Sequence, residues 1–360
     1  MAAIHEYFMS TTSPTGFSGL FEQLIDNYSA YRTYIIKAGP GCGKSSMMRR
    51  IADRIVAAGH DIELIHCSSD PLSLDAVLCR DLKFAIADGT DPHVLEPSIP
   101  AAKQEVVSLH HCIDNAKITA NFEKLRVLFD LNAQYVERAK RFVAAAGSLY
   151  FEIERTAKSF VLNDKVKRYA ENLAAKTMPK KSDRRGRETL RFSSAITSMG
   201  VVDFAESNFS DCSSVHIFED RYGAAAHALL DVVRDFALAG GSDIVTCRCP
   251  MSPFDKIDTV FVPSLSLAFV HSSYISPVSI KSAHVVRDRR FYDSDPVSAC
   301  QKRLAFSKKA ALKLLDEAGT LLSDAKTVHD EIEEYYIANV DFSKIREREK
   351  QICVDIGLEP

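Results

Sequence analysis

The chain has 360 residues, of which 46% are hydrophobic and 26% charged, the balance of an ordinary globular protein of two or three domains. Its formal net charge of -3 argues against a protein that coats nucleic acid or an anionic membrane. It has no apolar run of about 18 residues to span a membrane and no signal-peptide pattern at its start. The nine cysteines form no CxxC pair, so we expect reduced thiols and a cytoplasmic location.

The first predicted unit is a strand, a glycine-rich loop and a helix. Residues 34–36 are strand formers, and from Met48 apolar residues recur at helical spacing until Gly59. Between them, AGPGCGKS matches the phosphate-binding pattern G-x-x-x-x-G-K-[ST], with alanine in the first position. This order of elements predicts a P-loop that binds ATP.

Each residue type in this loop has a physical reason. Gly41 and Gly43 let the backbone approach the phosphates, and the amides from Gly41 onward converge on the β-phosphate at a helix N-terminus. Lys44 reaches the β- and γ-phosphates as the catalytic cation, and the Ser45 hydroxyl binds Mg²⁺. Cys42 occupies a variable position. The predicted nucleotide-binding residues are Ala38, Gly39, Pro40, Gly41, Cys42, Gly43, Lys44, Ser45 and Ser46.

A second predicted strand covers residues 62–65 and leads into HCSSDP. Polar residues after it reach the same sheet edge as the loop, where ligands bind in open α/β sheets. Asp70 is the first candidate for a base or water-orienting residue, and His66 is the second. Because Asp70 precedes Pro71, it could equally be a helix N-cap or a turn residue.

A third predicted strand, residues 82–88, ends in Asp88. We expect Asp88 to hold Mg²⁺ through a water molecule, while Gly89 leaves room beside the phosphates; the alternative is an acid that merely ends a strand. No glutamate follows Asp88 to polarise water. Hydrolysis is therefore expected to be slow, and phosphate transfer to a small acceptor gains weight.

Long helical segments are predicted over residues 117–163 and 304–332, as helical hairpins or coiled-coil arms that pack on each other. In the first arm, Arg138, Lys140 and Arg141 could form a lid over the phosphates or a solvated face. Residues 176–190 form a basic linker. The linker has no aromatic residue for base stacking, so nucleic acid is an unlikely partner.

The second half of the chain repeats the first. Residues 215–232 align with residues 33–50 at an offset of 182, and Leu74-Asp-Ala-Val77 aligns with Ile257-Asp-Thr-Val260. We therefore expect one repeat over residues 1–175 and another over residues 191–360. These repeats pair within the chain, or the chain forms a homodimer.

The chemistry of the loop is absent from the second repeat. In the second repeat Ala225 stands in place of Gly43, Ala226 in place of Lys44, His227 in place of Ser45 and His271 in place of Asp88. Glu219 and Asp220 stand where phosphates would bind and would repel them. We expect no Mg-nucleotide there. The two histidines could be a converted metal pair or a chance occurrence.

Several segments together resemble a family of bacterial two-repeat P-loop ATPases: HEYF, SPTGF, KAGPGCGKSS, HCSSDPLSLD, AIADGTDPH and YIANVDFSKI. The resemblance covers most of the chain and implies ATP binding. In that family the second repeat often keeps an intact P-loop, whereas the second repeat of this chain does not.

The sequence therefore predicts an α/β protein of tandem duplicated P-loop NTPase-like domains, with mainly parallel sheets and inserted helical arms. The predicted function is a slow or partner-stimulated Mg-dependent ATPase with its active site in the first repeat and a pseudo-site in the second. A small-molecule or nucleotide kinase and a non-catalytic nucleotide-sensing scaffold are the alternatives. The second substrate or protein partner is not identified.

Overall fold

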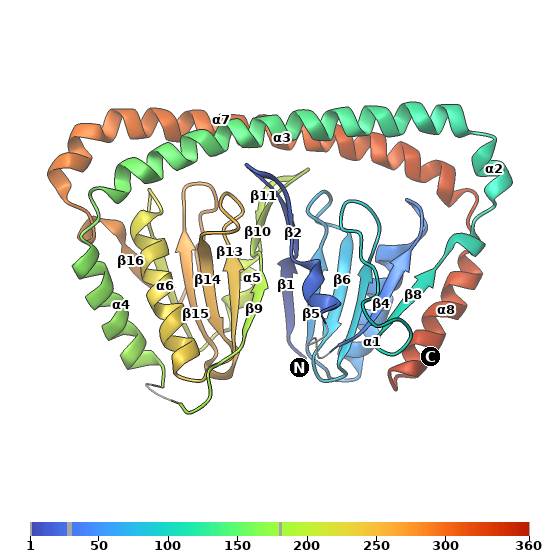
Figure 1. The fold of residues 1–360 in the computed structure, drawn as a ribbon, viewed down its shortest axis with the longest axis horizontal. Coiled ribbons are helices and arrows are strands. Elements are labelled where there is room, and N and C mark those ends of the chain that lie inside the picture. The colour runs from blue at the N-terminus through green and yellow to red at the C-terminus, as the bar shows by residue number, and fades with distance from the viewer. Residues whose placement is uncertain (1, 27–30, 180–181, 360) are drawn as a thin grey trace.

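The computed structural model describes residues 2–26, 31–179 and 182–359. Residues 180 and 181 of the predicted linker lie outside them. The chain is an α/β protein in which two mixed, mainly parallel six-stranded sheets lie side by side beneath two long helices (Figure 1). None of the described helices is both long and apolar enough to span a bilayer.

The first sheet places the strand that precedes the glycine-rich loop between two parallel neighbours. Its order is β1 (Ile4–Phe8), β5 (Ile62–His66), β6 (Leu74–Cys79), β7 (Phe84–Asp88), β4 (Arg32–Lys37) and β8 (Gln104–Ser108). Only β6 runs antiparallel to its neighbours. Helix α1 (Lys44–Ala57) covers the sheet with an apolar face that includes Met48, Ile51 and Ile55.

The second sheet repeats this order from the opposite edge. Its strands are β9 (Glu188–Arg191), β13 (Ile244–Arg248), β14 (Ile257–Val262), β15 (Leu267–Ser272), β12 (Ser214–Glu219) and β16 (His284–Arg287). Again only the third strand in this order, β14, is antiparallel to its neighbours. Helix α6 (Ala224–Ala239) occupies the place of α1. Two sheets with one topology are the arrangement expected of a tandem duplication.

Smaller elements complete both halves. The hairpins are β2 (Ser10–Ser13) with β3 (Gly16–Gly19), and β10 (Ser194–Thr197) with β11 (Gly200–Asp203). The short helices are η1 (Phe21–Leu24), η2 (His110–Cys112), α2 (Asn115–Thr119), α5 (Ala205–Phe209), η3 (Pro263–Leu265) and η4 (Asp288–Arg290).

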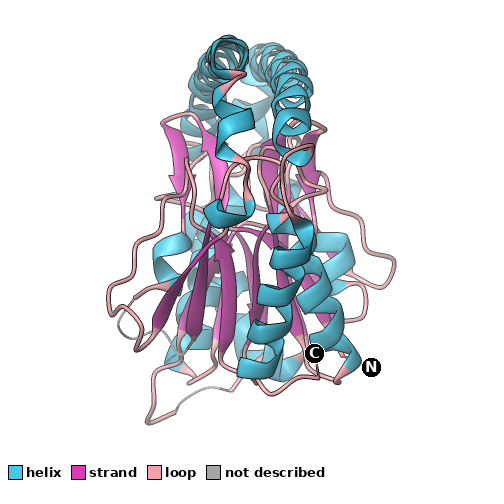
Figure 2. Ribbon diagram, turned by 90° about the vertical axis from the view of Figure 1, so that its right-hand side faces the viewer, coloured by secondary structure: helices cyan, strands magenta, loops and turns pink. Residues whose placement is uncertain are grey.

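The helical arms pack on each other, as the sequence predicts. Helices α3 (Phe122–Lys158) and α7 (Ser294–Ile337) run in opposite directions, side by side, above both sheets (Figures 1 and 2). Small and branched apolar side chains of both helices share buried clusters, among them Ala139, Val143, Leu315, Ala318 and Leu322. Because each helix spans both sheets, the arms tie the two halves together.

The arms also exchange their last helices. Helix α4 (Asn163–Thr177) packs against α6 of the second sheet, and α8 (Phe342–Asp355) packs against α1 of the first sheet (Figure 1). The α4 cluster contains Val166, Ala170, Leu230 and Val233. The α8 cluster contains Met48, Ile51, Ile345 and Ile352. Each sheet is therefore completed by a helix from the other half of the chain.

The sheets meet at the edges formed by β1 and β9. Phe8 and Phe192 exchange two backbone hydrogen bonds of 2.9 Å. Beside them the buried Arg191 guanidinium lies 2.7 Å from Glu63 Oε2. Burial alone would raise the pKa of Glu63, but the charges of Arg191 and Arg80 hold that pKa at about 2. The join between the halves thus contains a fully ionised pair.

Candidate functional site

The glycine-rich loop joins β4 to α1, as predicted. Gly41 and Gly43 have φ angles of +64° and +71°, in the left-handed region that only glycine adopts without strain. Gly43 is the N-cap residue of α1, so Lys44 and Ser45 form the first turn of the helix. The loop therefore places backbone amides and two functional side chains at a helix N-terminus.

Lys44 and Asp88 meet at the carboxyl edge of the first sheet. Lys44 Nζ donates to the Gly39 carbonyl at 2.9 Å and lies 3.4 Å from Asp88 Oδ2. They meet because β4 and β7 are adjacent parallel strands that pair Ile36 with Asp88. The other Asp88 oxygen, Oδ1, accepts hydrogen bonds from the amide and hydroxyl of Thr90 at 2.9 and 2.7 Å.

Ser45 and a second carboxylate lie at the same edge. Ser45 Oγ accepts a hydrogen bond of 2.9 Å from the Leu74 amide. The next residue, Asp75, stands opposite Asp88, because β6 and β7 pair Ala76 with Ala87. Asp75 is buried, and the repeat could have singled it out, since it aligns with an aspartate of the second half.

His93 completes this group of polar side chains. Its Nε2 lies 3.5 Å from Asp75 Oδ2, and its ring packs tilted against that of Phe21 with the centroids 4.5 Å apart. Burial would lower the pKa of His93, but Asp75 and Asp88 raise it above its ordinary value. Sequence reasoning missed His93, since no motif marks it.

The end of α7 covers the loop, although nearly 300 residues separate them in sequence. The Gly41 amide donates to Glu333 Oε1 at 3.1 Å. A Cβ atom on Gly41 would come within 2.8 Å of the Glu333 carbonyl oxygen, and one on Gly39 within 2.8 Å of the Tyr336 ring. A carboxylate therefore already accepts a hydrogen bond from one of the amides that the pattern assigns to phosphate.

Asp70 has the geometry of a turn residue. Its Oδ1 accepts a 3.2 Å hydrogen bond from the Leu72 amide, and its Oδ2 accepts one of 2.8 Å from the Ser73 hydroxyl. Lys326 of α7 lies 3.7 Å from Oδ2. These contacts match the turn alternative. A role as catalytic base stays a prediction.

His66 is buried where the two halves meet. Its Nδ1 lies 2.6 Å from the Pro71 carbonyl oxygen, to which it donates, and its Nε2 lies 3.2 Å from Glu6 Oε1. The ring stands 4.5 Å from that of Phe204, a residue of the second half. These contacts are sufficient to explain the buried position of His66 as structural. Its catalytic role also stays a prediction.

The basic residues of the first arm lie away from the loop. Arg138 and Arg141 are solvent-exposed, and Lys140 pairs with Glu137 at 2.5 Å. Between them, Ala139 packs in a cluster of the second half with Cys249 and others. The helix end that reaches the glycine-rich loop belongs to α7, the other arm.

The corresponding loop of the second half, residues 220–226, is filled by its own side chain. The Asp220 carboxylate accepts hydrogen bonds from the amides of Tyr222, Ala225 and Ala226 at 2.9 to 3.0 Å, and from the Tyr292 hydroxyl at 3.0 Å. The cavity beside it measures about 10 Å³, the space of one water molecule. This loop has neither the donors nor the volume for a triphosphate.

The first loop therefore combines backbone amides, an ammonium, a hydroxyl and two carboxylates at one sheet edge, a set suited to a phosphate group and a hard divalent cation. The second loop lacks this combination. Comparison with protein-family models, with curated proteins and with solved structures found no match for this chain.

Proposed function

We propose that the chain binds Mg-ATP at the glycine-rich loop as a P-loop NTPase with one working site. The observation that carries the proposal is the position of Lys44, which lies between the Gly39 carbonyl and Asp88 at the start of a helix. An ammonium held there can move onto the β- and γ-phosphates. The left-handed glycines carry no Cβ atom that would keep the phosphates from the backbone once the end of α7 has moved away.

The oxygen atoms around Lys44 fit Mg²⁺. Ser45, Asp75 and Asp88 supply a hydroxyl and two carboxylates, the hard ligands that this ion prefers. Asp75 Oδ2 is buried without a hydrogen bond, its nearest cationic partner being His93 Nε2 at 3.5 Å. Mg²⁺ bound among these residues would neutralise the charge that develops on the phosphates.

Glu333 makes this site a gated one. While its carboxylate accepts the hydrogen bond of the Gly41 amide, that amide cannot donate to a phosphate, and the negative charge of Glu333 repels an incoming nucleotide. Binding therefore requires the end of α7 to move. Because α7 crosses both sheets, such a movement would change its contacts with both halves of the chain. A binding step that needs this rearrangement supports slow or partner-stimulated hydrolysis.

The same contact favours a second candidate, a nucleotide-sensing scaffold. A helix that senses the nucleotide at one end and contacts the second half at the other can report binding without turnover. The absence of a glutamate after Asp88 suits this reading as well as it suits slow hydrolysis.

Equilibrium binding and turnover separate these functions. We expect purified full-length protein to bind ATP in the presence of Mg²⁺, to lose affinity with EDTA, and to release phosphate slowly. Tight binding with background turnover, even with cell extract added, would favour the scaffold. ADP formed only when metabolite acceptors are present would favour phosphate transfer. No ATP binding at all would refute the proposal.

We also propose a cytoplasmic location. All nine cysteines are free thiols, and several are buried beside strands of the two sheets. Thiols in such number persist in a reducing compartment.

A further inference from the structure

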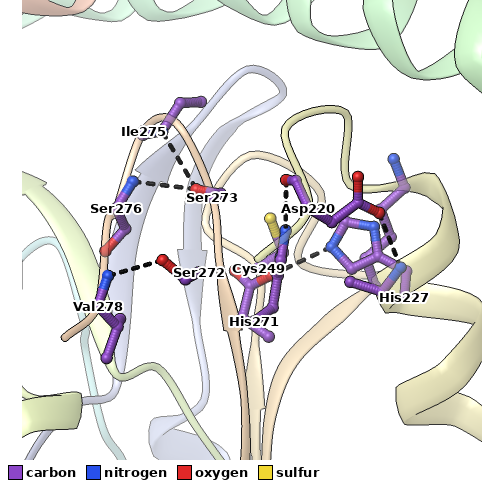
Figure 3. A network of polar contacts seen from close by, with 12 residues as sticks. Asp220, His227, Cys249, His271, Ser272, Ser273, Ile275, Ser276 and Val278 are labelled. Atoms are coloured by element: carbon purple, nitrogen blue, oxygen red, sulfur yellow. Dashed lines mark hydrogen bonds and ion pairs between the residues drawn. The ribbon is translucent and has the colours of Figure 1, made fainter. Parts of the chain in front are cut away.

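We propose that His227, Asp258 and His271 form a binding site for a divalent transition-metal ion, of which zinc is the best fit. The site lies in the second half, at the edge where α6, β14 and β15 meet beside the filled loop. Figure 3 shows His227 and His271 turned toward each other there, next to Asp220. The inference does not depend on nucleotide binding by the first half.

The three side chains already converge on one point. His227 Nε2 lies 3.1 Å and His271 Nδ1 lies 2.9 Å from Asp258 Oδ1, and one ligand atom from each residue falls within 4.8 Å of the others. Tetrahedral zinc with bonds of about 2.0–2.1 Å needs ligand atoms roughly 3.3 Å apart. The two imidazole–carboxylate separations would have to widen by a few tenths of an ångström to admit the ion, and any pair of ligand atoms near the 4.8 Å limit would have to move closer together.

The surroundings of the histidines are those of metal ligands. His271 Nε2 lies 3.3 Å from the Asp220 carbonyl oxygen, so it can donate there while Nδ1 faces the ion. A backbone carbonyl that receives the second ring N–H is the usual partner of a metal-bound histidine. His227 Nδ1 is buried without a hydrogen bond, so of the two rings only that of His271 has this second partner.

The charge of Asp258 points to a cation. Its side chain is largely buried, and within the described residues its ion-pair partners are His227 and His271, with no lysine or arginine. A buried carboxylate requires a compensating positive charge. A divalent ion bound by two neutral imidazoles supplies it.

The first half shows how this site relates to Mg²⁺. By the repeat, His227 corresponds to Ser45, Asp258 to Asp75 and His271 to Asp88. The same three positions thus hold a hydroxyl and two carboxylates in one half, and two imidazoles and one carboxylate in the other. Oxygen ligands suit magnesium, whereas imidazole nitrogens suit zinc and its neighbours.

The expected role is structural. The ligands come from α6, β14 and β15, so a bound ion would fasten the helix to two strands. The neighbouring cavity of about 10 Å³ admits no substrate. The ion would hold the second loop in its closed form, with Asp220 on its amides.

Metal titration of the whole protein tests the proposal. Chelator-treated protein is titrated with Zn²⁺ against a chromogenic chelator, and with Co²⁺ while the visible spectrum is recorded. We expect one ion per chain, the absorption bands of a low-symmetry Co²⁺ site, and a higher unfolding temperature with Zn²⁺. Folded wild-type protein that binds neither ion would overturn the proposal.

Variants then locate the ion. His271→Gln and His227→Gln should each weaken zinc binding by roughly 100-fold. His284→Gln alters another histidine pair of this half, His216 and His284, whose rings stack at 5.1 Å and which belong to no metal-ligand cluster among the described residues; it should leave binding unchanged. If the ligand variants bind zinc as tightly as the wild type, the site lies elsewhere and the proposal fails. If they do not fold, the wild-type Co²⁺ spectrum still decides whether histidine binds the ion.

Discussion

The two loops occupy the same place in their sheets and differ in where their carboxylate comes from. Each follows the corresponding strand of its sheet and starts a helix at a left-handed glycine, Gly43 with φ +71° and Gly223 with φ +81°. In the first loop, one amide donates a hydrogen bond to the carboxylate of Glu333, which lies on a helix far away in the sequence. In the second loop, Asp220 accepts three amides from inside the loop itself.

This difference separates a site that can open from one that cannot. Glu333 can leave the loop if α7 shifts, because a single hydrogen bond joins its side chain to the loop and its other charged contact, His329 at 3.5 Å, lies on α7 itself. Asp220 cannot leave without breaking its own loop. Substitutions at these loops, and at the exchanged helix that supports the first, test the comparison.

The largest effect is expected from Lys44→Ala. Without the ammonium, the β- and γ-phosphates lose the one side-chain cation that the loop offers them, and ATP affinity should fall by about 100-fold or more in a calorimetric titration. Ala226→Ser, at the corresponding position of the second loop, should leave the affinity unchanged. Equal affinity of the Lys44 variant and the wild type would remove the basis of the site assignment.

Ile352→Ala tests the exchange of helices that supports the first loop. Ile352 is fully buried between α8 and the first sheet, so its truncation should lower the free energy of unfolding by about 3 kcal/mol, measured in urea. Val354→Ala on the same helix serves as the control, because Val354 is 52% exposed. Similar small losses in both variants would mean that α8 does not support the first half.

Asp220→Asn tests whether the second loop is filled for stability. The loss of charge weakens hydrogen bonds from three amides and the Tyr292 hydroxyl, and should cost about 2 kcal/mol of unfolding free energy. Asp211→Asn, at an exposed position, should cost almost nothing. In a Lys44→Ala background the Asp220 variant should still fail to bind ATP. Restored binding would show that the second loop is a masked nucleotide site.

Glu333→Gln tests the gate and should produce the smallest change. The amide side chain can still accept from Gly41, but the charge that opposes phosphate is gone, so ATP affinity should rise about tenfold. Glu334→Gln, on the exposed neighbouring residue, is the matched control. If both variants bind ATP like the wild type, Glu333 does not gate the loop.

Local patterns were enough to predict the loop, its flanking strand and helix, and the repeat. Left-handed glycines, alternating strand formers and helical spacing act over a few residues, so they leave a readable signal in the sequence. The same holds for the arms, whose apolar stripes require a partner helix. The strand β6 escaped prediction, because Asp75 interrupts its apolar run just after the polar segment HCSSDP.

Only the tertiary structure decided what the distant residues do. Which sheet α4 and α8 complete depends on the direction in which α3 and α7 cross, and no short-range pattern records it. Glu333 reaches Gly41, and His227 reaches His271, because sheet order and helix length bring their backbones together. The sequence alone determined that one loop carries a glycine, a lysine and a serine that the aligned loop of the second half lacks. The fold decided that both loops have carboxylates against their amides, since a helix N-terminus attracts a negative charge from wherever the chain can supply one.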